Sequence, residues 1–67
     1  MNSEMQLTAK QMYIAEAEAI KNDFPNMMFD SLIDARNGSK KNMEDRLDMI
    51  QRHLDEFKMK CRMISVF

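Results

Sequence analysis

Residues 43–64, MEDRLDMIQRHLDEFKMKCRMI, are the stretch that decides the fold. Apolar side chains recur here at alternating steps of four and three residues, at Met43, Leu47, Ile50, Leu54, Phe57, Cys61 and Ile64. Only a helix lines up such residues on one face, and no glycine or proline interrupts the run. Leu47, Leu54 and Cys61 occupy heptad position a, and the other four residues occupy position d. The pattern predicts a long helix over about 40–64 whose a/d stripe has to be buried.

A second and weaker apolar line follows the opposite side of this predicted helix. We call it the outer line; with the charged residues that interrupt it and the aromatic residue at its end, it comprises Met49, Arg52, Glu56, Met59, Met63, Val66 and Phe67. One interpretation is scattered surface methionine, which is common in soluble proteins. The other is a contact surface for a second copy or for another protein, because methionine repacks easily against different shapes.

The N-terminal part predicts a first helix over about 9–22. Thr8 is a candidate N-cap, and Gln11 stands where its side chain can complete a capping box. Within this segment the apolar residues again follow steps of four and three, at Tyr13, Ala17, Ile20 and Phe24.

Pro25 predicts the end of that helix, because proline lacks an N–H and disfavours a helical conformation in the residue before it. A second, shorter helix is then expected over about 26–36. Its apolar face would help to cover the a/d stripe of the C-terminal helix, and it comprises Met28, Phe29, Leu32 and Ile33. Gly38, which tolerates a left-handed backbone, predicts its end. Ser39 or Asn42 would cap the long helix.

These lengths give the architecture. About 25 residues at 1.5 Å each make the C-terminal helix roughly 37 Å long, and the two shorter helices together match that length. Residues 1–67 are therefore expected to form a single all-α domain. The pattern fits a helical hairpin with a broken arm, a three-helix bundle and a pair of associated hairpins equally well.

The size of the chain limits its core. Sixty-seven residues bury little apolar surface, and Cys61 is the only cysteine, so no internal disulfide can supply stability. We therefore expect self-association, most simply a homodimer. The net charge of −1 argues against a general polyanion binder.

Catalytic and metal-binding patterns are missing from the sequence. His53 is the only histidine, which excludes motifs built on histidine pairs, and the single glycine cannot build a phosphate-binding loop. We therefore expect no catalytic residues, no metal and no cofactor. A chain without an N-terminal signal segment, whose longest apolar run is the four residues 12–15, is expected to be cytoplasmic and to lack a membrane span.

Two features suggest ligands other than protein. The predicted helix start after Gly38 could attract a phosphate or nucleotide, with an anion site formed by Arg36, Ser39, Lys40 and Lys41. A helix-turn-helix DNA-binding regulator is the weaker alternative, because Glu44, Asp45 and Asp48 would repel DNA phosphates.

The sequence thus favours a small helical protein–protein interaction module, a regulator or inhibitor that binds a partner macromolecule without catalysis. This expectation rests on the two apolar lines of the C-terminal helix and on the absence of a catalytic set. Salt-dependent binding would distinguish the phosphate and DNA alternatives from it.

Overall fold

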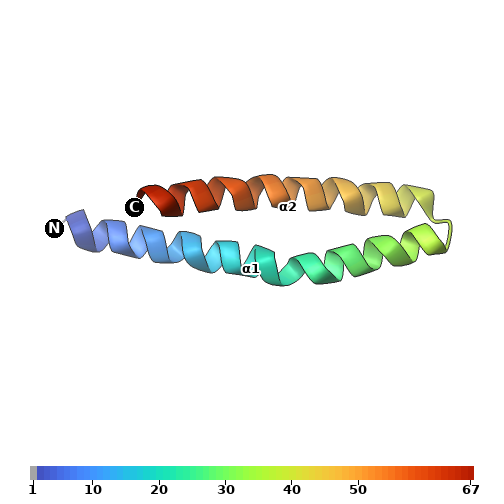
Figure 1. Ribbon diagram of the computed structural model, residues 1–67, viewed down its shortest axis with the longest axis horizontal. Coiled ribbons are helices and arrows are strands. Elements are labelled where there is room, and N and C mark those ends of the chain that lie inside the picture. The colour runs from blue at the N-terminus through green and yellow to red at the C-terminus, as the bar shows by residue number, and fades with distance from the viewer. Residues whose placement is uncertain (1) are drawn as a thin grey trace.

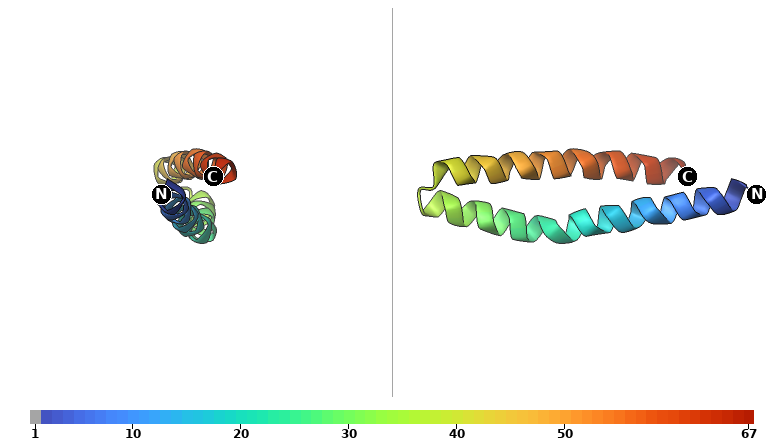
Figure 2. Two further views of the ribbon diagram at one scale, coloured as in Figure 1. Left: turned by 90° about the vertical axis from the view of Figure 1, so that its left-hand side faces the viewer. Right: turned by 180° about the vertical axis from the view of Figure 1, so that it is seen from behind.

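The chain forms an antiparallel helical hairpin. The computed structural model describes the backbone of residues 2–67 and the side chains of residues 8–67. Helix α1 spans Asn2–Arg36 and helix α2 spans Lys40–Val66, with a short turn between them (Figure 1). The two helices lie side by side in both views across the long axis (Figure 1 and the right view of Figure 2), and the molecule measures 55 × 15 × 13 Å. Throughout the described backbone the structure is helical, apart from the turn and Phe67.

Helix α1 is continuous, which corrects the expectation of two helices over 9–22 and 26–36. It begins at Asn2, so Thr8 lies inside the helix and is not its N-cap. Pro25 is also inside it. The missing N–H removes one helical hydrogen bond and the ring crowds the preceding turn, and α1 bends near its middle instead of ending there (Figure 1). The structure is therefore a hairpin and not a three-helix bundle.

The turn after α1 is a Schellman motif, and α1 ends at Arg36, just before Gly38, as the sequence predicted. The N–H of Ser39 donates to the carbonyl of Asp34 at 2.9 Å, and that of Gly38 donates to Ala35 at 3.2 Å. Gly38 has φ +77°, a left-handed conformation that suits a residue without Cβ. Ser39 occupies the N-cap of α2 without a capping bond from its side chain, and Asn42 lies within the helix.

The seam between the helices differs from the predicted a/d stripe. Position d faces α1, where Phe57 packs edge-on against Phe24 with ring centroids 6.4 Å apart. Position a lies nearer the flank, because Leu47 is 43% exposed and Cys61 is also exposed, although Leu54 between them is half-buried. The polar residues Arg46, His53 and Lys60 complete the seam on the other flank.

The core is correspondingly thin. Ala17 and Ile20 are the buried apolar residues of the described part, and no side chain there is fully enclosed. Two helices in contact along one line leave most of each surface open, so the fold alone buries only part of the apolar pattern.

Candidate interaction surfaces

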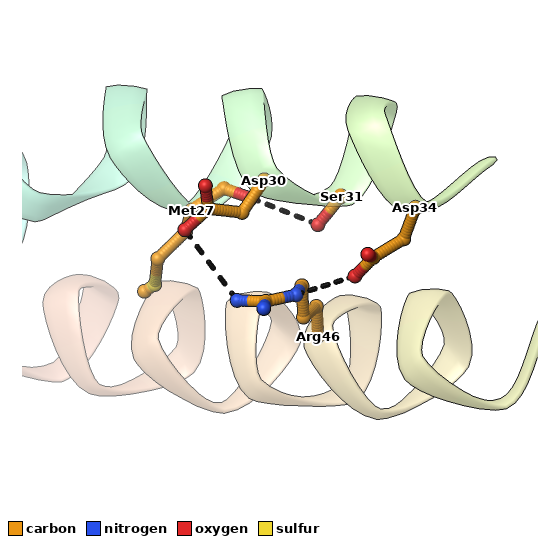
Figure 3. A network of polar contacts seen from close by, with 5 residues as sticks. All are labelled: Met27, Asp30, Ser31, Asp34 and Arg46. Atoms are coloured by element: carbon orange, nitrogen blue, oxygen red, sulfur yellow. Dashed lines mark hydrogen bonds and ion pairs between the residues drawn. The ribbon is translucent and has the colours of Figure 1, made fainter. Parts of the chain in front are cut away.

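One side of the hairpin, which we call the polar side, is marked by ion pairs between the helices. Arg46 of α2 hydrogen-bonds to Asp34 of α1 and lies 3.4 Å from Asp30 (Figure 3). Toward the open end, Lys60 Nζ lies 3.1 Å from the Glu16 carboxylate. These pairs fix the register of the two helices and identify which flank of each helix faces the same way.

The seam also holds polar groups inside it. Ser31 is buried, and its hydroxyl donates to the Met27 carbonyl at 2.8 Å within α1 (Figure 3). The Lys60 side chain is only 9% exposed, and its ammonium lies 5.5 Å from the centroid of the Tyr13 ring. His53 Nδ1 is buried and has no hydrogen-bond partner among the described residues. The seam is therefore polar as well as apolar.

The side opposite the ion pairs is apolar, as helix geometry shows. Residues three positions before and three after a seam residue lie on opposite flanks of a helix. Asp34, three after Ser31, is on the polar side, so Met28, three before, is on the other. On α2, Arg46 and Leu47 precede the seam residue Ile50 by four and three positions and occupy opposite flanks. Met28 and Leu47 therefore share one side of the hairpin.

Leu32 and Leu54 extend this surface. The paired residue numbers add up to 80 for Asp34–Arg46 and 81 for Phe24–Phe57, which places Leu32 level with Leu47. Met28 falls between the levels of Leu47 and Leu54 by the same rule. Met28 is 56% exposed and Leu32 is 60% exposed, whereas Leu54 is half-buried. We call the four the apolar face: Met28, Leu32, Leu47 and Leu54.

The borders of the apolar face are mixed. Phe29, 64% exposed, continues it around the outside of α1. Toward the open end Lys21 interrupts it, and beyond Lys21 the half-buried Ile14 and the exposed Cys61 lie on the same side. The continuous apolar surface is thus the half of the hairpin nearest the turn.

The outer line lies apart from the apolar face. Met49, Met59 and Val66 are exposed, and Met63 is half-buried. Arg52 and Glu56 line a shallow depression together with Met49 and His53. Phe67 instead contacts α1, where its ring stacks on that of Tyr13 with centroids 5.8 Å apart. The predicted set therefore includes one residue that belongs to the contact between the helices.

The four residues of the predicted anion site are close to one another in the sequence, around the turn between the helices. Lys41 Nζ lies 3.4 Å from Asp45, so an acid one helical turn away already balances its charge. The Ser39 N–H is used by the turn, and the Lys40 N–H donates to Gly38 at 3.0 Å. Arg36 is exposed in the last turn of α1. No contact joins these four side chains into a cradle in the described structure.

The described residues offer neither a metal-binding cluster nor a membrane-spanning helix. Within residues 8–67, no three His, Cys, Asp or Glu side chains gather as a metal would require. Neither described helix combines the length and apolar character needed to cross a bilayer.

Sequence reasoning missed the apolar face because it assigned Met28 and Leu32 to cover the a/d stripe. The sequence does contain a pattern that indicates which residues of α1 face α2. The steps of four and three that begin at Tyr13 continue through Phe24 to Met27, Ser31 and Asp34. This continuation places Met28 and Leu32 beside the seam.

No family model, curated protein or solved structure matches this chain.

Proposed function

We propose that this chain is a small helical protein–protein interaction module, a regulator or inhibitor that acts by binding a partner protein and not by catalysis. The observation that carries the proposal is the imbalance of apolar burial. Ten large apolar side chains of the described part are at least 37% exposed, whereas two apolar residues are buried. Contiguous exposed apolar surface on a soluble scaffold is typical of protein contact sites.

The polar groups of the hairpin support binding over catalysis. Catalytic acid–base groups need to converge in a concave site that holds a substrate. Here Lys60 is engaged with Glu16 in the seam, and the hollow beside His53 is a shallow depression on one helix. A surface of this shape suits the side of a partner protein better than a small substrate.

We assign the partner protein to the outer line of α2. Met49 and Met59 are 46% and 49% exposed, and the charged Arg52 and Glu56 lie between them. An exposed helix side with apolar anchors and interspersed charges can pack into a hydrophobic groove of a partner. The charged side chains would fix the orientation of the helix in the partner's groove, while the methionines supply apolar contact area that adapts to its shape.

Affinity capture from the native host tests this assignment. The bait is the wild-type chain, compared with the triple variant Met49→Gln, Met59→Gln, Met63→Gln. Met12→Gln serves as the matched control, since Met12 is 61% exposed on α1 outside the outer line. We expect a protein that the wild type and the control retain and the triple variant loses, and calorimetry with the purified partner should reproduce the difference. Equal capture by all three baits, or none, would refute the assignment.

Phosphate and DNA ligands remain the alternatives, and the observed geometry gives them less support. Lys41 is paired with Asp45, and Asp45 projects from the same helix start that a phosphate would have to approach. Calorimetric titration with ATP and with a DNA duplex tests both. We expect no binding heat; affinity that falls steeply with added salt would replace the protein-binding proposal.

A further inference from the structure

We propose that two copies of the hairpin associate through the apolar face, Met28, Leu32, Leu47 and Leu54, as a two-fold symmetric four-helix bundle. This inference goes beyond the proposed function, because it concerns a different surface and a second copy of the same chain. It also differs from the dimer expected through the outer line.

Both a and d positions are apolar along α2, yet α1 covers position a less completely than position d. The d residues and Leu54 are half-buried, whereas Leu47 and Cys61 are exposed. Leu47 at position a stays 43% exposed. A helix in a four-helix bundle contacts two neighbours and buries both positions, whereas a helix in an isolated hairpin has one neighbour. A second hairpin on the apolar face supplies the missing neighbour.

Both helices contribute to the apolar face at matching levels. Leu32 of α1 is level with Leu47 of α2, and Met28 lies between Leu47 and Leu54. The surface is therefore a continuous band across the hairpin instead of a stripe on one helix. A two-fold contact uses the same band twice, so it requires no second surface of different chemistry.

The side of the hairpin that carries the apolar face measures 55 by 15 Å. The apolar face takes up the half nearest the turn, roughly 400 Å². That is about half of the area that each partner contributes to a standard stable protein interface. Contacts along the rest of this side, toward the open end, are needed to complete the interface.

The thin core gives the physical reason for association. Among the side chains of residues 8–67, Ala17 and Ile20 are the buried apolar ones, so the hairpin has little burial there to offset the loss of chain entropy. In the bundle, the exposed leucines and Met28 move into an apolar interior. Removing these side chains from water favours association.

Sedimentation equilibrium at about ten micromolar tests the proposal, because association depends on protein concentration. The wild type should have twice the chain mass of 8.0 kDa. Met28→Gln with Leu47→Gln should return the mass to that of one chain. The matched control, Met49→Gln with Met59→Gln on the outer line, should remain a dimer, since these methionines are similarly exposed but lie on another surface.

Three results would overturn the inference: a wild-type mass of one chain, a mass beyond two chains, or dissociation by the control pair instead of the apolar-face pair. A second measurement uses the wild type alone, in case the variants unfold. Cys61 is exposed on the apolar side of one hairpin. Its reaction with a thiol reagent should slow several-fold as the protein concentration rises through the dimerisation range, and an unchanged rate contradicts the proposal.

The two proposals fail separately. Loss of partner capture by the outer-line variant is independent of the mass of the wild type, and a monomeric wild type leaves the outer line available to a partner.

Discussion

Lys60 joins the two helices near the open end of the hairpin, with its ammonium 3.1 Å from Glu16 and 5.5 Å from the centroid of Tyr13. The lysine side chain is 9% exposed and the glutamate side chain is 52% exposed. A desolvated cation thus has one partly hydrated anion and one aromatic face as partners. The Tyr13 ring is itself held by stacking on Phe67.

The Lys60 contact predicts opposite effects for two substitutions. Glu16→Gln removes the compensating charge and should lower the free energy of unfolding by about 1 kcal/mol, moderated because water reaches Glu16. Lys60→Met keeps the length of the side chain and removes the cost of burying a charge, so stability should stay equal or rise. Thermal unfolding followed by circular dichroism measures both. A larger loss of stability for Lys60→Met than for Glu16→Gln would show that the favourable contacts of the Lys60 ammonium outweigh the cost of burying its charge.

Gly38 gives a prediction about the turn. Its φ of +77° is left-handed, and a Cβ there would meet no atom within 4 Å, so the cost of Gly38→Ala is one of backbone conformation alone. We expect a loss of about 1–2 kcal/mol. Gly38→Asn is the control, because asparagine adopts this conformation more readily than alanine and should be less destabilising. Equal losses for alanine and asparagine in urea titration would argue against this origin.

The sequence predicted the helical class, the long C-terminal helix and the turn, because these depend on local patterns. Alternating steps of four and three residues specify a helix whatever its partner, and the Asn37-Gly38 pair favours a left-handed stop. The structure agrees on each: α2 begins at Lys40, and Gly38 has the expected positive φ.

The predicted helix end at Pro25 was wrong, because the prediction considered the local preference of proline and not the packing of α1 against α2. Proline costs a helix one hydrogen bond, but α1 packs along α2 on both sides of that residue. Phe24 before the proline contacts Phe57, and Ser31 after it is buried in the seam. Packing of both segments favours one bent helix over two separate ones.

The flank of α2 that faces α1 could not be predicted from the heptad pattern of α2 alone. Positions a and d are both apolar, so the pattern of that helix fits either flank. The pairs between Arg46 and Asp34 and between Lys60 and Glu16 involve residues 12 to 44 positions apart, which no local pattern relates. These long-range contacts rotate α2 and leave Leu47 at the surface.

Pro25 yields a prediction from the same reasoning. Pro25→Ala restores an N–H that can donate within α1 and removes the clash of the ring with the preceding turn. Because an interior proline costs a helix about 3 kcal/mol and alanine gives back some flexibility to the unfolded chain, we expect a net gain of roughly 1–2 kcal/mol. Helical content by circular dichroism should stay the same or rise slightly. A marked loss of stability would mean that the bend is needed to bring Phe24 onto Phe57.

The last prediction separates the seam from the apolar face by truncating one residue of each. Ile20 is 5% exposed in the seam, so Ile20→Ala leaves a cavity and should cost about 2–5 kcal/mol, enough to unfold so small a hairpin. Leu47 is 43% exposed. In a single hairpin Leu47→Ala removes a side chain that is close to half exposed, so its cost should be about 1 kcal/mol and well below that of Ile20→Ala. Unfolding is measured at dilutions where sedimentation shows one chain, and again at about ten micromolar. If copies pair through the apolar face, Leu47→Ala becomes clearly more destabilising at the higher concentration, because a contact between chains is then lost as well. A large loss for Leu47→Ala in the dilute monomer would instead place position a in the core of the single hairpin.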